Sequence, residues 1–468
     1  MDIRKGKEIF RGAKRLPVAL IRPFQAFVKE EVFGSVLLLT AALVAFAWAN
    51  SGYAASYHHF WESDVSLSAW GYGITRSFRD WINEGLMAVF FFIVGLEIKR
   101  ELLVGELASA KKAVLPAGAA LGGMLVPALV YLFFNRGMTS AGGWGIPMAT
   151  DIAFALGALY VLGKRVPFGI RIFLSALAIV DDLGAVLVIA FFYTKEIMAG
   201  YLLIGLGVFV LIVTANLLWI RNALVYGVLG IFLWLALLGS GLHATVAGIV
   251  VAFCIPARGK YDTDNFVRAV KGYLDQFECL PEGCGFSILL NGKHLNAVQS
   301  IELACHHVET PLQRFERSLH AWVAFLIVPL FALANAGLTM AEIDMGKALS
   351  SPVTLGVICG LIIGKPLGIA FFSFLLVRMK MASLSAGVRW SHIVGAGILG
   401  GIGFTMSLFI TELSFGGPPS FDYAKVGVFI GSIVSGIGGL LFLLAASGSR
   451  PSAEVAKQGG VPGAQRGK

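Results

Sequence analysis

The segment Ser175-Ala-Leu-Ala-Ile-Val-Asp-Asp-Leu-Gly-Ala-Val-Leu-Val-Ile-Ala-Phe-Phe192 is long and apolar enough to cross a bilayer, yet it contains the adjacent acids Asp181 and Asp182. One ionised aspartate at a helix centre costs ~2.5–3.5 kcal/mol on insertion scales, so such a pair must face protein or water. Two like charges this close cannot ionise independently, and the pair can hold either a proton or a cation. The segment therefore predicts cation and proton handling inside a membrane.

The composition of the whole chain supports a membrane protein. Of its 468 residues, 57% are hydrophobic and only 14% are charged, which predicts an all-α polytopic membrane protein rather than a soluble one. Twelve apolar runs are candidates for crossing the bilayer, at residues 32–50, 85–98, 113–134, 145–163, 168–193, 199–218, 223–239, 241–255, 319–336, 353–377, 391–412 and 424–446.

The lysines and arginines predict the orientation, because cytoplasmic loops are enriched in them. With the N-terminus inside, thirty of the 37 basic residues fall in cytoplasmic segments and six in outside loops. Lys365 alone falls deep within a crossing run. We therefore expect both termini to be cytoplasmic. The net charge of +9 then reflects orientation, and no nucleic-acid partner is expected.

This topology divides the chain into a membrane part and four accessory segments. Residues 1–31 form a basic cytoplasmic N-terminal segment, 32–446 the transmembrane part, and 447–468 a disordered cytoplasmic tail. Residues 51–80 form an outside loop, in which apolar and serine residues alternate from Val65 onward as in a short strand. Residues 256–316 form a cytoplasmic insertion that we expect to be reduced and flexible.

Two of the runs carry helix-breaking residues at membrane depth. Pro147 and Thr150 should loosen the backbone just before Asp151 in the fourth run. The eleventh run contains a glycine cluster, which favours an unwound segment at Gly400, Gly401 and Gly403. Helices broken in the membrane expose N–H and C=O ends of opposite partial charge. An aspartate can offset the positive ends and a lysine the negative ends, and Asp151 and Lys365 are the candidates.

Several segments together resemble the NhaA family of bacterial sodium/proton antiporters. They are Trp81–Glu101, Ala149–Gly157, Ala176–Ala185, Ser240–Thr245, Pro329–Gly337, the surroundings of Lys365, and Gly403–Ser407. The resemblance covers residues 30–446. It implies twelve helices, two inverted three-helix repeats (spans 3–5 and 10–12), and crossed broken helices in spans 4 and 11. It also implies electrogenic exchange of more than one proton per sodium ion, in the bacterial inner membrane.

The resemblance also assigns roles to individual residues. Asp181 and Asp182 match the family's ion-binding pair, with Asp182 as its central carboxylate. Thr150 and Asp151 match the crossing of the broken helices, and Lys365 matches the intramembrane lysine that pairs with the first aspartate. The implied cargo is sodium or lithium and protons, with no cofactor.

Other matches concern ion entry and the response to pH. Glu84 occupies a funnel position where an acid is usual, and His243 matches a histidine tied to pH dependence. The matches to the family's pH-response cluster are Glu97, Arg100, Glu101, Glu316 and His320. Gln313 departs from the pattern, since a basic residue often stands there. The resemblance therefore does not predict the pH at which the protein becomes active. The outside loop matches a hairpin used in forming a homodimer.

The residues alone also allow plainer roles. Lys365 and Asp151 could serve only to balance helix ends, His243 could be a packing residue, and the acidic and basic cluster could be ordinary charges at a helix end. The insertion contains Cys279, Cys284 and Cys305 followed by two histidines, but its spacing matches zinc fingers poorly.

Three other functional classes compete with exchange. A sodium-coupled symporter of a small organic solute ranks second, although no further cluster of polar residues suggests its pocket. A cation channel would not need the lysine and two broken helices. An enzyme ranks last, because no nucleophile–base or metal-ligand motif is present.

Overall fold

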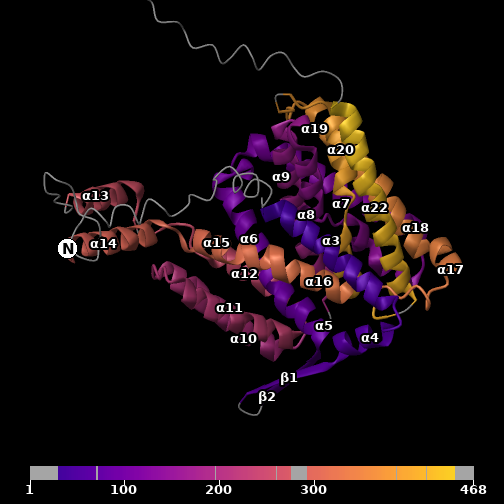
Figure 1. The fold of residues 1–468 in the computed structure, drawn as a ribbon, viewed down its shortest axis with the longest axis horizontal. Coiled ribbons are helices and arrows are strands. Elements are labelled where there is room, and N and C mark those ends of the chain that lie inside the picture. Colours follow the sequence, from indigo (N-terminus) through magenta and orange to yellow (C-terminus); the bar gives the residue numbers. More distant parts are fainter. Residues whose placement is uncertain are drawn as a thin grey trace, which may run out of the picture.

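The computed structural model describes residues 30–447 except 70–71, 195–196, 260, 276–291, 386 and 418. These residues form a helical bundle with one small two-stranded sheet (Figure 1). Within them, ten helical segments are long and apolar enough to cross a membrane, and a bent helix pair makes an eleventh. The expected all-α polytopic fold is confirmed. Most of the expected N-terminal segment and of the C-terminal tail lies outside the described residues.

Each of the twelve expected runs overlaps one helical segment. In chain order these segments are α3 (Glu30–Ala49), α5–η1–α6 (Phe78–Asp80, Trp81–Leu86, Met87–Val104), α7 (Ala110–Asn135), η3–α8 (Thr139–Met148, Ile152–Leu162), α9 (Phe168–Phe192), α10 (Ala199–Leu217), α11 (Ala223–Ser240), α12 (Thr245–Cys254), α15–η6–α16 (Pro311–Trp322, Val323–Ile327, Val328–Asn335), α18–η7–α19 (Pro352–Cys359, Gly360–Gly364, Lys365–Arg378), α20–α21 (Trp390–Gly400, Phe404–Ser414) and α22 (Ser420–Ser447). The ten-residue α12 is the short apolar helix at the eighth position.

The second and ninth spans are longer than their apolar runs. The ninth begins at Pro311 rather than near residue 319, because Thr310 and Gln313 form a capping box that starts α15. Its first turns are amphipathic and therefore escape a search for apolar residues alone. The structure contains both breaks expected in spans 4 and 11, whereas the inverted relation between the two three-helix repeats stays a prediction.

Short elements mark the two ends of the bundle. At one end, α4 (Ala54–Glu62) leads into an antiparallel hairpin of β1 (Asp64–Ala69) and β2 (Tyr72–Ser77), in which Val65 pairs with Arg76. The expected strand is thus present, and we call this end the hairpin face. At the other end, the described part of the insertion forms α13 (Thr263–Leu274) and α14 (Gly292–Val308). Its expected flexibility stays a prediction. Figure 1 shows α13 and α14 projecting beyond α15, and we call this end the insertion face.

Close backbone contact fixes α19 against α7. A Cβ atom added to Gly122 would lie 2.3 Å from the carbonyl oxygen of Gly368, and one added to Gly368 would lie 2.1 Å from that of Gly122. Small residues let membrane helices approach this closely. One turn before Gly368, the side chain of Lys365 passes Gly123 and enters the bundle, where it is fully buried. The glycine contact therefore positions the buried lysine.

We expect Gly122→Ala to destabilise the protein by ~1–3 kcal/mol, the usual cost of overpacking, because the new methyl group meets backbone that cannot rotate away. The matched control is Gly207→Ala on α10, where an added Cβ meets nothing within 4 Å. Thermal unfolding of the two purified variants in one detergent measures the difference. Equal melting temperatures for Gly122→Ala and the wild type would contradict the close contact.

Candidate functional site

The breaks in spans 4 and 11 meet inside the bundle. Span 4 changes from the 3-10 helix η3 to α8 through Ala149–Asp151, and both Ala149 and Asp151 have extended backbone angles. In span 11 the chain bends by 46° between α20 and α21. The backbone N–H of Asp151 donates to the carbonyl oxygen of Ile402 at 2.7 Å. The two interrupted helices are therefore hydrogen-bonded to each other at their breaks.

Asp151 caps the positive ends of both following half-helices. One carboxylate oxygen accepts from the backbone N–H of Phe154 at 3.2 Å, in the first turn of α8. The other accepts from Thr405 at the start of α21, from its N–H at 3.0 Å and its hydroxyl at 2.5 Å. A carboxylate in this position satisfies free N–H groups and opposes the partial positive charge of both helix ends.

Lys365 and Thr150 contact the negative ends of the preceding half-helices. The ammonium of Lys365 donates to the carbonyl of Met148, the last residue of η3. The hydroxyl of Thr150 lies 3.0 Å from the carbonyl oxygen of Gly400, the last residue of α20. Lys365 is the first residue of α19 and directly follows the π-helical turn η7, a feature that often marks functional sites.

The aspartate pair of α9 lies beside this crossing, and the two acids differ in their partners. Asp181 accepts from the ammonium of Lys365 at 2.5 Å and from the hydroxyl of Thr150 at 2.6 Å, both through the same oxygen. Its second oxygen and both oxygens of Asp182 have no hydrogen-bond partner among the described residues. Both side chains are about 1% exposed. Three buried carboxylate oxygens thus lack donors among the described residues, and buried polar groups of this kind need a partner such as a proton, a cation or water.

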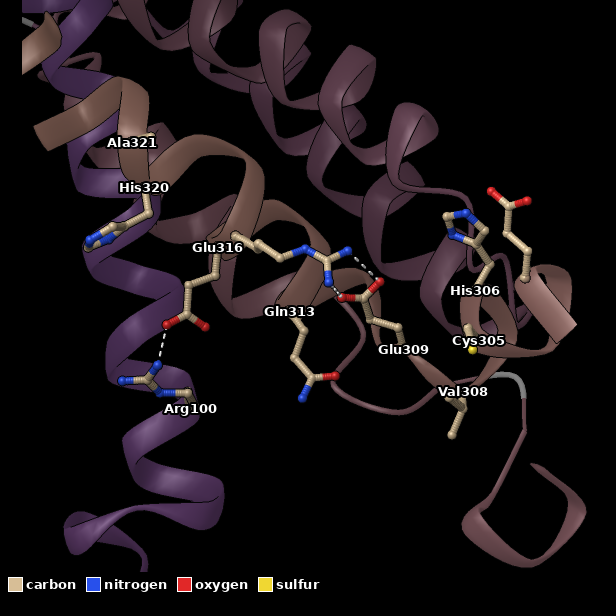
Figure 2. Close-up of a pocket in the computed structure, with 11 residues that line it drawn as sticks. Arg100, Cys305, His306, Val308, Glu309, Gln313, Glu316, His320 and Ala321 are labelled. Carbon is tan, nitrogen blue, oxygen red and sulfur yellow. Dashed lines mark hydrogen bonds and ion pairs between the residues drawn. The ribbon is translucent and has the colours of Figure 1, made fainter. Parts of the chain in front are cut away.

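The charged residues expected at the cytoplasmic side gather between α6 and α15. Arg100 forms an ion pair with Glu316, and its other terminal nitrogen lies 3.4 Å from Glu101 and 3.9 Å from Glu97. Figure 2 shows Glu316 and His320 on the same side of α15, facing α6. Arg100, Glu316 and His320 line a cavity of about 1040 Å³ together with residues from the end of α14. The end of the insertion thus lines the same cavity as part of the cluster.

Glu84 and His243 lie apart from both groups. Glu84 is in the π-helical turn η1, where its carboxylate is 3.9 Å from Arg76 of the hairpin. His243 lies in the turn between α11 and α12, and its ring nitrogen is 3.0 Å from the carbonyl oxygen of Tyr193 at the end of α9. This contact is one that a packing residue would make.

Sequence reasoning missed Thr405 as a site residue. The sequence did indicate its position, since a threonine just after the glycine break is well placed to start a half-helix. Its partner Asp151, however, is distant in sequence. Gln313, the departure from the family pattern, completes the capping box with Thr310. For the zinc hypothesis, Cys279 and Cys284 lie outside the described residues. Within the described ranges, no three His, Cys, Asp or Glu side chains are grouped to hold a metal ion.

Comparison with known proteins identifies the family of the chain. The sequence model of a family described as Na+/H+ antiporter 1 matches residues 25–443. The chain is 47% identical to Na(+)/H(+) antiporter NhaA 2 of Syntrophotalea carbinolica over 92% of its length and 97% of the relative. It is 45% identical to NhaA of Oleidesulfovibrio alaskensis, covering 92% and 96%, and 43% identical to NhaA of Syntrophobacter fumaroxidans, covering 97% of each. The chain therefore belongs to the NhaA family of Na+/H+ antiporters.

Proposed function

We propose that this protein exchanges sodium, or lithium, for protons at the Asp181–Asp182 pair by alternating access. The observation that carries the proposal is the carboxylate of Asp182, which is buried and has no donor among the residues described. A buried carboxylate in that state is stabilised by a proton or by a cation. The names of the relatives support sodium and protons as the cargo.

The available atoms fit a small hard cation. Sodium prefers oxygen ligands, and the two oxygens of Asp182 with the second oxygen of Asp181 provide three. Carbonyl groups freed at the helix breaks and water complete such a shell. Protons compete for the same carboxylates. If the site switches its exposure from one side of the membrane to the other only when it holds sodium or protons, each turnover exchanges one for the other.

Lys365 couples a second charge to the exchange. Its ammonium pairs with Asp181 inside the protein, where separating the pair is costly. When sodium takes the oxygens of Asp181, that pairing weakens and the lysine can give up a proton. Two carboxylates and one ammonium together release more than one proton for each sodium bound. The exchange is then electrogenic, with net positive charge moving against the sodium flux.

The cluster around Arg100 and the hairpin supply the regulatory and assembly parts of the proposal. Arg100 joins acids of span 2 to Glu316 of span 9, so protonation of these acids changes how the two spans are held together. The hairpin of β1 and β2 extends from the bundle, and we assign it to contact with a second copy in the bacterial inner membrane. The hairpin face then lies outside the cell and both termini inside.

We expect Asp182→Asn to abolish exchange while leaving folding intact, because the amide can neither store a proton nor supply a charged ligand. The control, Asp264→Asn, changes an exposed acid on α13 and should retain full activity. Uptake of radioactive sodium into proteoliposomes with an imposed pH gradient measures both variants. Near-wild-type exchange in Asp182→Asn protein would rule out the proposed site.

We expect wild-type exchange to generate current, and Lys365→Gln to reduce or alter that current because one titratable group is removed. Each elementary charge crossing ~100 mV is worth ~2.3 kcal/mol, so an inside-negative potential should drive sodium out. Currents on solid-supported membranes after sodium jumps test this, with Lys111→Gln at an exposed position as the control.

Two results would count against this account of Lys365 and charge movement. Exchange without current in the wild type excludes the coupling of several protons to one sodium ion. Unchanged current and unchanged thermal stability in Lys365→Gln would show that the lysine serves neither in proton coupling nor in balancing the helix ends.

A further inference from the structure

The end of the insertion is held by both chains that connect it to the bundle. On the entering chain, the backbone N–H of Tyr261 donates to the carbonyl oxygen of His307 at 3.0 Å. On the leaving chain, Arg314 of α15 donates to the carbonyl oxygens of His306 and Glu309, to the latter at 3.3 Å. These bonds satisfy carbonyl groups at the C-terminal end of α14, so the end of that helix has a defined position against α15.

Adjacent residues of α6 contact both of these chains. The ammonium of Lys99 donates to the carbonyl oxygens of Phe253 and Ile255, where α12 ends and the entering chain begins. The next residue, Arg100, forms its ion pair with Glu316 on the leaving chain. The two chains that carry the insertion are thus bonded to the same turn of span 2, which also carries the charged cluster.

One cation of the shared cavity is paired with the insertion. Arg317 follows Glu316 on α15, but its guanidinium binds the carboxylate of Glu309, just past the end of α14. The two contacts measure 2.9 Å and 3.0 Å, which is the paired geometry of a strong guanidinium–carboxylate interaction. The side chain of Glu309 is 18% exposed and that of Arg317 is 74% exposed, so the arginine has room to change partner if Glu309 is removed.

The charged and titratable groups around Glu316 come from three elements. Figure 2 shows Glu316 and His320 toward α6, and Glu309 toward the end of α14. The groups are Glu97, Arg100 and Glu101 of α6, Arg317 and His320 of α15, and Glu302, Cys305, His306 and Glu309 of the insertion. The helix α11 also packs against α15 and has no charged residue. Because Glu309 neutralises Arg317, removing either partner leaves one uncompensated charge in the cavity, and the sign depends on which partner is lost.

We propose that the insertion sets the midpoint pH of exchange, because Glu309 binds Arg317 and so keeps the charge of that arginine from the cluster. This inference rests on the proposed function, in which protonation of the cluster's acids changes how spans 2 and 9 are held together. A cation released beside an acid favours the ionised form of that acid, whereas an unpaired carboxylate nearby opposes it. Glu309 is therefore a positioning residue that acts on Glu316 through Arg317.

Removing one charge at a time from this ion pair should shift the pH dependence in opposite directions. In Glu309→Gln the released arginine favours ionised acids, so the midpoint of exchange should move about 0.3–0.5 units to lower pH, whether exchange rises or falls there. In Arg317→Gln the uncompensated Glu309 should move the midpoint to higher pH by a similar amount. The double variant Glu309→Gln, Arg317→Gln lacks both charges and should return close to the wild-type midpoint. Arg317→Lys, which keeps the charge, and Asp264→Asn, an exposed acid outside the cavity, should not move it.

The measurement is sodium/proton exchange by the full-length protein in proteoliposomes, recorded at saturating sodium over a range of pH. A second series contains ~1 M choline chloride, where the Debye length is ~3 Å, and the shifts should shrink there. Maximal rates should stay unchanged, which shows that the variants are folded. Unmoved midpoints, shifts of both single variants in the same direction, or shifts that salt does not reduce would overturn the role of Glu309 and leave exchange at Asp182 intact. A wild-type protein without sodium/proton exchange would overturn the proposed function and this inference together.

Discussion

The arrangement depends on one constraint: a helix interrupted inside a membrane protein must find partners for the ends it exposes. Spans 4 and 11 create two N-terminal and two C-terminal ends within a small volume. Asp151 binds both N-terminal ends, while Lys365 and Thr150 contact the C-terminal ends. Each broken helix therefore supplies part of what stabilises the other, and neither break would be stable alone.

This constraint also explains why the two aspartates of α9 differ. Lys365 is drawn to the end of η3 and to Asp181 together, and Thr150 contacts Asp181 as well as the end of α20. Asp181 is thereby tied to the balance of the helix ends. Asp182, one position further along α9, has no such ties in the described structure. The helix crossing thus ties one oxygen of Asp181 and leaves both oxygens of Asp182 without a donor among the described residues.

Apolar runs and helix breakers in the sequence predicted the twelve segments and both breaks, because these depend on local composition. The pairing of Lys365 with Asp181 was implied only by the resemblance to the NhaA family, because the residues alone do not say which of Asp151, Asp181 and Asp182 the lysine meets. The sequence did not predict the 3-10 form of η3, the π-helical turn before Lys365 or the link from Thr405 to Asp151. These depend on how distant segments pack, and single-residue propensities do not contain that information.

The contact between Gly122 and Gly368 restricts how the site can change. Backbone lies against backbone there, so α7 and α19 cannot slide past each other by a side-chain rearrangement and must move as one rigid unit. The Cα atom of Lys365 moves with that unit. The distance between its ammonium and Asp181 is therefore set by the torsions of a four-carbon side chain and by the position of α9. Because the backbone of Lys365 is held by α7, the length of its side chain limits how far α9 can be displaced before the ion pair breaks.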